Sequence, residues 1–196
     1  MAIEPDQVTA DRVTQRCYMA ANEEKIPLLI GLLRGMEDAR VIVFANTKRA
    51  TDAIWGYLEG NGLRAAILSG DVPQRKRLHL LKQFQGGELP ILVATDVAAR
   101  GLHIPKVPHV INFDVPVVPD DYINRVGRTA RAGQIGDALT FASPGEKQLV
   151  NAIERAVGRS IPRRTIEGFD YKAQPKGRLE IPAGERIAAH RARRAE

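Results

Sequence analysis

The sequence predicts an α/β domain with a mainly parallel central sheet and helices on both faces. Short, continuously apolar segments such as VIVFA at 41–45 and ILVA at 91–94 are typical of strands that are buried on both sides. Segments with apolar residues at helical spacing stand between such strands. This alternation favours parallel strands joined by right-handed crossovers, with binding sites at the carboxyl ends of the strands.

In the first half of the chain, polar caps and glycines separate the predicted elements. Asn22 is predicted to cap the first helix, and glycines follow the next two helices at 60–62 and 86–87. The predicted elements of this half are a strand at 14–20, a helix at 23–35, a strand at 41–45, a helix at 48–59, a strand at 65–68 and a helix at 72–85.

The second half continues the same alternation. Its strands are again short and apolar, and Gly158 ends its last helix. The predicted elements are strands at 91–94 and 109–113, a helix at 120–126, a strand at 138–142 and a helix at 146–157.

Length and composition exclude several protein classes. The chain has 196 residues, of which 44% are hydrophobic and 27% charged. This length suits one globular domain with an extension, and this composition excludes collagen-like and wholly disordered proteins. The single cysteine, Cys17, cannot form an internal disulfide, and no zinc-binding spacing occurs. No apolar run approaches the roughly 20 residues of a membrane span, and no signal peptide pattern opens the chain. We therefore expect a soluble, cytoplasmic protein.

Three regions are predicted along the chain: a lead-in segment at 1–12, a domain at 13–162 and a basic, flexible tail at 163–196. Residues 172–196 hold seven Lys/Arg and three Asp/Glu, a net +4, which leaves +2 of the total +6 for the rest of the chain. A positive balance suits a polyanionic partner. On the body of the domain, phosphate contacts must therefore come from individually placed residues.

The loop after the strand at 41–45 has the composition of an anion site. Its sequence is NTKR at 46–49, in which either Asn46 or Thr47 can cap the following helix. The free N–H groups and two cations would then stand beside a helix N-terminus, where anions bind. The alternative is a plain cap with solvated cations.

The loop after the strand at 65–68 combines a close-approach glycine, Gly70, with a run of cations. Asp71 and Gln74 fit a capping box, and RKR follows at 75–77. The helix dipole disfavours cations in the first turn, so their presence favours a bound anion. A solvated basic face is the alternative.

The segment ATDVAARGLHI at 94–104 follows another buried strand. Thr95 and Asp96 are suited to cap a helix, and Gly101 allows a ligand to approach the backbone. His103 is either a ligand contact or an internally satisfied loop histidine.

Three arginines recur at every third position in YINRVGRTARAG at 122–133. Arg125, Arg128 and Arg131 would converge on one side, where mutual repulsion is unfavourable unless anions or carboxylates balance it. Arginine is suited to bidentate phosphate contacts. The alternative for one of the three is an ion pair with a nearby carboxylate: Asp114, Asp120 or Asp121.

In this order, the four segments resemble the C-terminal domain of superfamily 2 helicases, in particular the second RecA-like domain of DEAD-box RNA helicases. VIVFANTKR is similar to motif IV, SGDVPQRKR to the segment after it, ILVATDVAARGLHIP to motif V and YINRVGRTARAG to motif VI. The resemblance covers about residues 13–162 and implies a RecA-like three-layer sandwich. The combination of NEEK, FANTK and SIP looks most similar to the bacterial helicases of the RNA degradosome (the helicase B branch), which implies a degradosome ribonuclease as a partner.

The resemblance implies a role for each matching residue. Arg128 and Arg131 match arginine fingers that contact the phosphates of ATP and are the expected catalytic residues. Gly101 and His103 match positions near the ribose and phosphates of the nucleotide, although the family commonly has Asp at the second. The positions that match the RNA backbone path are Thr47, Arg49, Gly70, Asp71, Arg77, Thr95 and Asp96.

Several features of the chain differ from a complete helicase. Asn124 replaces the usual His and Ala130 the usual Gly of motif VI, whereas Arg125 matches a residue of an internal carboxylate network. No G-x-x-x-x-G-K-[ST] loop and no D-E-A-D sequence occur. Phosphoryl transfer needs a phosphate cradle and Mg²⁺ ligands. We therefore expect no metal ligand in this chain, and binding of ATP and Mg²⁺ only together with an N-terminal RecA-like domain of a parent protein.

The expected function is the C-terminal half of an ATP-dependent RNA helicase. It would supply arginine fingers to ATP and part of a cleft that binds the RNA backbone independently of sequence. It would unwind short RNA duplexes only together with the N-terminal domain, and the chain alone would be inactive. The alternative is a stand-alone RNA- or protein-binding scaffold without catalysis; a DNA helicase of the same superfamily fits the motifs less well. No membrane partner is expected.

Overall fold

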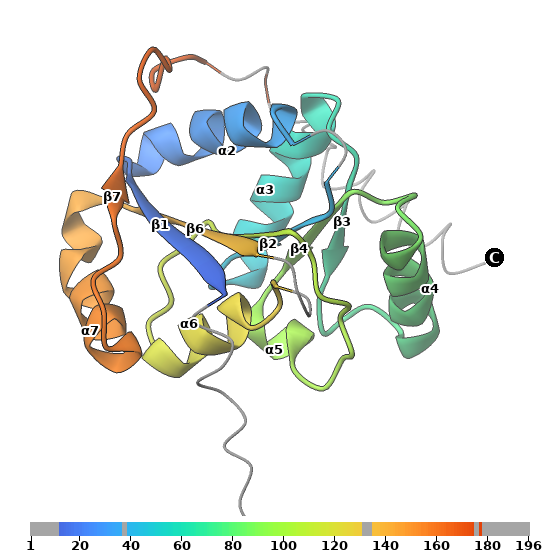
Figure 1. The fold of residues 1–196 in the computed structure, drawn as a ribbon. Coiled ribbons are helices and arrows are strands. Elements are labelled where there is room, and N and C mark those ends of the chain that lie inside the picture. The colour runs from blue at the N-terminus through green and yellow to red at the C-terminus, as the bar shows by residue number, and fades with distance from the viewer. Residues whose placement is uncertain (1–11, 37–38, 131–134, 175–176, 178–196) are drawn as a thin grey trace, which may run out of the picture.

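The computed structural model describes residues 12–36, 39–130, 135–174 and 177. They form a seven-stranded, entirely parallel sheet with the strand order β3-β4-β2-β5-β6-β1-β7 and helices on both faces (Figure 1). This arrangement confirms the α/β fold class, with a parallel central sheet between two layers of helices.

The strands are β1 (Val13–Met19), β2 (Val41–Phe44), β3 (Ala65–Leu68), β4 (Ile91–Ala94), β5 (His109–Asn112), β6 (Gly136–Ala142) and β7 (Arg163–Arg164). The α-helices are α2 (Lys25–Arg34), α3 (Lys48–Gly60), α4 (Gln74–Gln85), α5 (Asp96–Ala99), α6 (Pro119–Val126) and α7 (Lys147–Val157). Two 3₁₀ turns, η1 (Asn22–Glu24) and η2 (Pro144–Glu146), precede α2 and α7. Each predicted strand and helix is present with small shifts at its ends. β7 was not predicted, and α5 was anticipated only through the helix cap expected at Thr95 and Asp96. Asn22 begins η1 and does not cap the first helix.

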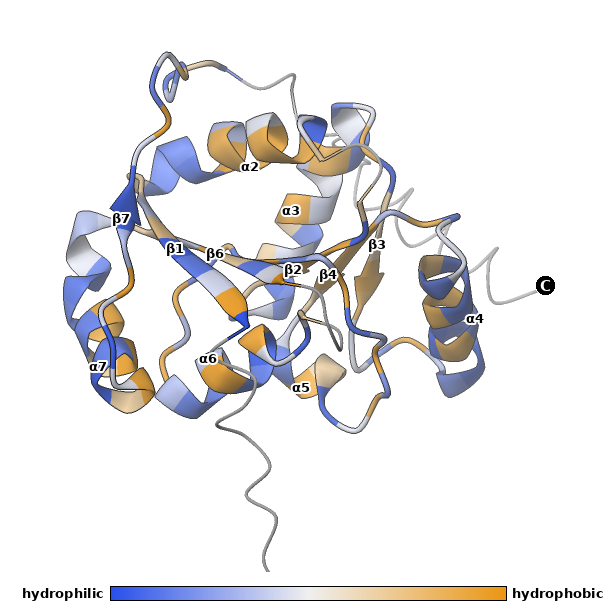
Figure 2. Ribbon diagram, in the orientation of Figure 1, coloured by the Kyte–Doolittle hydropathy of each residue, from blue (hydrophilic) through white to orange (hydrophobic). Residues whose placement is uncertain are grey.

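The central strands are buried on both faces, which explains why they are apolar along their whole length. Val41 and Val43 pack with α2 and α3, whereas Ile42 and Phe44 pack with α4 and α5 on the opposite face. Figure 2 shows the hydrophobic strands inside and the hydrophilic outer sides of α4 and α7. Among the described residues, no helix has the length and apolar character that a membrane crossing requires.

Parallel pairing brings the ends of the central strands to one edge of the sheet. Phe44 of β2 lies in register with Ala94 of β4 and Asn112 of β5, and Leu68 of β3 lies in register with Ala94. The four loops that follow these strands therefore meet at the carboxyl edge, where the sequence predicts the site.

The structure differs from the prediction that the tail begins at residue 163. β7 pairs with β1 in register Cys17 to Arg163, and the chain then packs along α2. Phe169 lies so close to Gly31 that a Cβ atom there would be 2.3 Å from its Cε2 atom. Residues 163–171 thus belong to the packed domain. Residues 1–11 of the lead-in, and 175–176 and 178–196 of the tail, lie outside the described residues.

Candidate functional site

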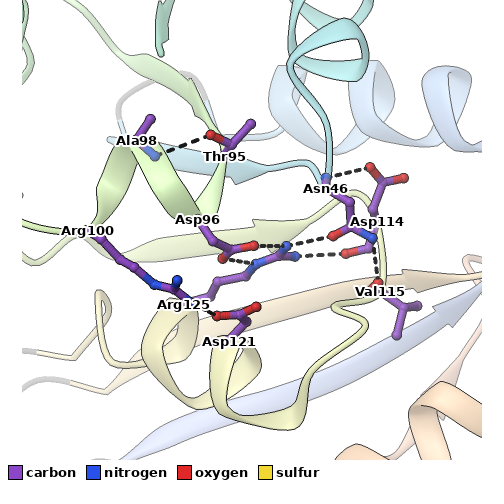
Figure 3. Close-up of polar contacts among 9 residues, drawn as sticks. All are labelled: Asn46, Thr95, Asp96, Ala98, Arg100, Asp114, Val115, Asp121 and Arg125. Atoms are coloured by element: carbon purple, nitrogen blue, oxygen red, sulfur yellow. Dashed lines mark hydrogen bonds and ion pairs between the residues drawn. The ribbon is translucent and has the colours of Figure 1, made fainter. Parts of the chain in front are cut away.

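A buried arginine ties together three loops at the carboxyl edge (Figure 3). Arg125, on α6, is 1% exposed, and its Nε and Nη2 atoms each donate to one carboxylate oxygen of Asp96 at 2.7 Å. Nη2 also donates to Asn46 Oδ1 at 2.8 Å, and Nη1 donates to the carbonyl oxygen of Asp114 at 2.9 Å. The guanidinium carbon lies 5.3 Å from the centroid of the Phe44 ring. Because charge-assisted, bidentate bonds are strong and directional, they fix the relative positions of these loops.

The loop after β2 uses its two polar residues for different purposes. Asn46 links loops: its backbone N–H donates to Asp114 Oδ2 and its Nδ2 donates to the Val115 carbonyl oxygen, both at 2.9 Å. Thr47 is the N-cap of α3, and its Oγ1 accepts from the Ala50 N–H at 3.1 Å. The side chains of Thr47 and Arg49 are exposed beside the N-terminus of α3, as an anion site requires.

The capping box predicted before α4 is wrong. The helix begins at Gln74, its N-cap position is Pro73, and no side chain caps it. Asp71 forms an ion pair with Lys48 instead, which joins the loop after β3 to the start of α3.

Arg77 holds the same loop from the first turns of α4. Its Nε donates to the Val72 carbonyl oxygen at 2.7 Å, and its Nη2 donates to the Gly70 carbonyl oxygen at 2.5 Å. Gly70 itself is exposed, with nothing within 4 Å of the position of a Cβ atom. The guanidinium of Arg77 thus shapes the loop, and the exposed backbone at Gly70 faces solvent.

The loop after β4 contains four of the predicted site residues. Thr95 caps the short helix α5, where its Oγ1 accepts from the Ala98 N–H at 3.3 Å. Asp96 is held by Arg125, as described above. Gly101 has a φ of +73°, a backbone conformation that favours glycine, and both Gly101 and His103 are exposed.

The three predicted arginines have different environments. Arg125 is paired with a carboxylate, but with Asp96 and not with the predicted Asp114, Asp120 or Asp121. Asp114 contributes its carbonyl oxygen, and Asp121 pairs with Arg100. Arg131 lies outside the described residues.

Arg128 differs from Arg125 because its side chain is half-buried and not fully buried. Within the described ranges, its guanidinium makes no hydrogen bond and no ion pair. It lines a small cavity together with Asp121, Asn124 and Arg125. A cation that is partly desolvated and has no protein partner is suited to bind an anion.

The family model of the helicase conserved C-terminal domain matches residues 24–133. The chain belongs to this family. It is 52% identical over 162 residues to the ATP-dependent RNA helicase RhlB of Psychromonas ingrahamii, covering 82% of this chain and 38% of the relative. It is 50% identical over 185 residues to RhlB of Haemophilus influenzae, covering 94% and 43%. The helicase domain thus spans about two fifths of the length of these relatives.

Solved structures of DEAD-box proteins have the same fold. The crystal structure of Escherichia coli SrmB bound to regulator of ribonuclease activity A matches with a TM-score of 0.73 and 35% identity, covering 84% of this chain and 98% of that chain. A DEAD box protein of Methanococcus jannaschii matches with a TM-score of 0.73 and 30% identity, covering 79% and 42%. The resemblance to a DEAD-box C-terminal domain of the RhlB type is therefore confirmed.

Sequence reasoning missed several residues that build the site of this helicase domain. Asn46 was weighed only as a cap, Lys48 only as a cation of the anion site, and Arg100 and Thr129 were given no role. The position of Asn46 directly after β2, at the same edge as Asp114, was the one available signal for its linking role. Among the described residues, no group of three His, Cys, Asp or Glu side chains is placed to hold a metal ion.

Proposed function

We propose that this helicase domain is the C-terminal half of an ATP-dependent RNA helicase. It supplies Arg128 and Arg131 to the phosphates of ATP, with Gly101 and His103 beside the nucleotide. The observation that carries the proposal is the guanidinium of Arg128, which has no partner among the described residues and lies next to the Arg125 network that joins the loops of motifs IV and V. An N-terminal RecA-like domain supplies the phosphate cradle and the Mg²⁺ ligands.

The arginines act on charge that develops during phosphoryl transfer. The transferring phosphoryl group carries negative charge over its oxygens, and a positioned guanidinium stabilises that charge in the transition state. Closure of the two domains brings Arg128 to the nucleotide. The domain is therefore inactive alone, because it lacks the phosphate-binding loop and the Mg²⁺ ligands.

The RNA path runs along the exposed loops of the same edge. Thr47, Arg49 and the free N–H groups of α3 offer donors to phosphates, and the carboxylates of Asp71 and Asp96 offer acceptors to ribose hydroxyls. Arg77 shapes the Gly70 backbone, and Thr95 lies beside Asp96. Contacts of this kind position RNA without reading its bases, so binding is independent of sequence. The cytoplasm is the proposed location and a degradosome ribonuclease the proposed protein partner.

Steady-state phosphate release tests the half-site proposal. The two-domain protein that contains this chain is compared with the 196-residue chain alone, each with and without single-stranded RNA. We expect RNA-stimulated release from the two-domain protein and none from the isolated chain. Turnover by the isolated chain that survives rigorous purification would overturn the proposal. RNA binding without turnover by the two-domain protein would favour the scaffold function instead.

A further inference from the structure

The turn that carries Arg128 is bonded to the segment that precedes β5. The hydroxyl of Thr129, which is 0% exposed, donates to the Val107 carbonyl oxygen at 2.6 Å, with the Pro108 carbonyl oxygen 3.0 Å away. In return, the Val107 N–H donates to the Arg128 carbonyl oxygen at 2.9 Å. Residues 107 and 129 thus form an isolated parallel bridge that fixes the backbone on the C-terminal side of Arg128.

The same turn is crowded and conformationally strained. Ala130 has a φ of +65°, a left-handed conformation that is unfavourable for a residue with a Cβ atom. Gly136, at the start of β6, packs so tightly that a Cβ atom there would be 2.1 Å from Thr129 Oγ1 and 2.4 Å from the Ala130 nitrogen. A strained turn persists only where its surroundings hold it. The Thr129 hydroxyl is the side-chain group that makes this attachment.

The bridge also joins the two segments that carry the proposed nucleotide contacts. Val107 follows the loop of Gly101 and His103, and Thr129 follows Arg128 directly. The hydroxyl of Thr129 therefore adds a side-chain bond to the backbone bond that joins these two segments. Its loss would leave the turn attached through the Val107 N–H and the Arg128 carbonyl oxygen alone, so that Arg128 is held less precisely.

We propose that Thr129 is a positioning residue for ATP hydrolysis, which presents Arg128 by anchoring its turn to Val107. This inference rests on the proposed function. In the proposed function, Arg128 stabilises the charge distribution of the transition state more than that of bound ATP, so misplacing it lowers kcat and leaves KM for ATP nearly unchanged. Displacements of about 1 Å in such groups cost up to about 10²-fold in rate.

Thr129→Val, which keeps the shape and removes the hydroxyl, is the decisive variant. In the two-domain protein, we expect it to lower kcat for RNA-stimulated phosphate release by about 10- to 100-fold, with KM for ATP changed less than about 2-fold. Thr129→Ser keeps the hydroxyl and is expected to retain kcat within about 2-fold. Thr140→Val is the matched control, because Thr140 is also buried and its Oγ1 accepts from Asn112 Nδ2 at 3.1 Å, away from the turn. The control is expected to lose stability and keep its kcat.

A double-mutant cycle separates positioning from general destabilisation. If Thr129 acts through Arg128, Thr129→Val causes no further loss of kcat in an Arg128→Ala background. An equal loss in both backgrounds, or equal kcat for the Val and Ser variants, would overturn the positioning role. If Arg128→Ala itself leaves kcat unchanged, the proposed function fails instead. Should thermal denaturation show that Thr129→Val is unfolded, Thr129→Cys, a weak donor of similar size, takes its place with the same expectations.

Discussion

Arg125 and Arg128 lie three positions apart in one segment, yet the structure places them in opposite environments. Arg125 is 1% exposed and makes four hydrogen bonds to Asp96, Asn46 and Asp114. Arg128 is half-buried, and its guanidinium has no partner among the described residues. Residue type alone therefore does not separate the arginine that holds the fold from the one that we propose to act on ATP. The proposed distinction rests on their burial and on their hydrogen-bond partners.

The difference has an energetic cause. A guanidinium has five N–H donors. Arg125 makes four hydrogen bonds within the protein, so few of its N–H groups are left to bind a ligand. Burial of this charge is tolerated because a carboxylate and two acceptor oxygens surround it. The donors of Arg128 have no partner among the described residues, and in the proposed function a phosphate of ATP accepts from them. We therefore expect that removal of Arg125 lowers the stability of the domain, whereas removal of Arg128 lowers the rate of ATP hydrolysis.

The largest expected effect is on catalysis. Arg128→Ala in the two-domain protein should lower kcat for phosphate release by about 10³–10⁵, because it removes an arginine finger from the transition state. Arg131→Ala is expected to act in the same way. The free energy of unfolding should change by less than about 0.5 kcal/mol for Arg128→Ala, as for the exposed control Arg155→Ala. Normal turnover in both finger variants would mean that the two arginines have structural roles.

The next effect is on stability. Arg125→Met should lower the free energy of unfolding of the domain by about 3–5 kcal/mol, because it leaves the carboxylate of Asp96 without its buried counter-charge. Urea denaturation monitored by circular dichroism measures the loss, with Arg155→Met as the control. A loss below about 1 kcal/mol would remove the distinction between the two arginines.

A smaller effect concerns RNA binding by the isolated chain. Ending the chain after Tyr171 preserves the packing of Phe169 and Tyr171 and removes seven of the chain's Lys and Arg residues. Most of the sequence-independent binding should disappear, together with its salt dependence, since each phosphate contact on single strands contributes a slope of about −0.7. Arg77→Ala should change this binding little. Fluorescence anisotropy at several salt concentrations tests both statements, and undiminished binding by the shortened chain would make the folded edge the main RNA site.

The smallest effect is a pH dependence at the edge of the sheet formed by β7. Hydrogen bonding from Arg163 and from the Ile161 N–H keeps the pKa of Glu154 below its ordinary value, although partial burial opposes this. A lowered folded-state pKa stabilises the protein above the ordinary pKa, and that stability is lost as the pH falls through the folded-state pKa. Glu154→Gln should therefore be less stable than the wild type by up to about 1 kcal/mol at neutral pH, and the difference should shrink on acidification. A difference that is constant between pH 7 and pH 3 would contradict this explanation.

The fold was predictable where local pattern and burial coincide. Segments 41–45 and 91–94 are apolar throughout because β2 and β4 are covered on both faces. β7 was not predictable in this way, since its two exposed arginines carry no apolar pattern. It exists because β1 has a free edge, where the Cys17 N–H donates to the Pro162 carbonyl oxygen at 2.8 Å.

The site was predictable as a set of loops but not as a set of bonds. Sequence neighbours could not decide whether Asn46 or Thr47 caps α3, because the partners of Asn46 lie far along the chain at Val115 and Arg125. The predicted capping role of Asp71 failed for a similar reason, since its partner is Lys48 of another element. Ion pairs between distant loops depend on how the strands of the sheet are paired. That pairing cannot be predicted from the sequence of one loop.

Binding of a transition-state mimic tests most directly whether Arg128 acts on the transferring phosphate. The affinity of the two-domain protein for ADP alone and for ADP with aluminium fluoride is measured in the presence of RNA, for the wild type and Arg128→Ala. We expect the variant to bind ADP with an affinity within about 2-fold of the wild type and to bind the fluoride complex about 10³-fold more weakly, because transition-state mimics report the interactions that a finger makes. Equal affinity of both proteins for the fluoride complex would contradict the central claim.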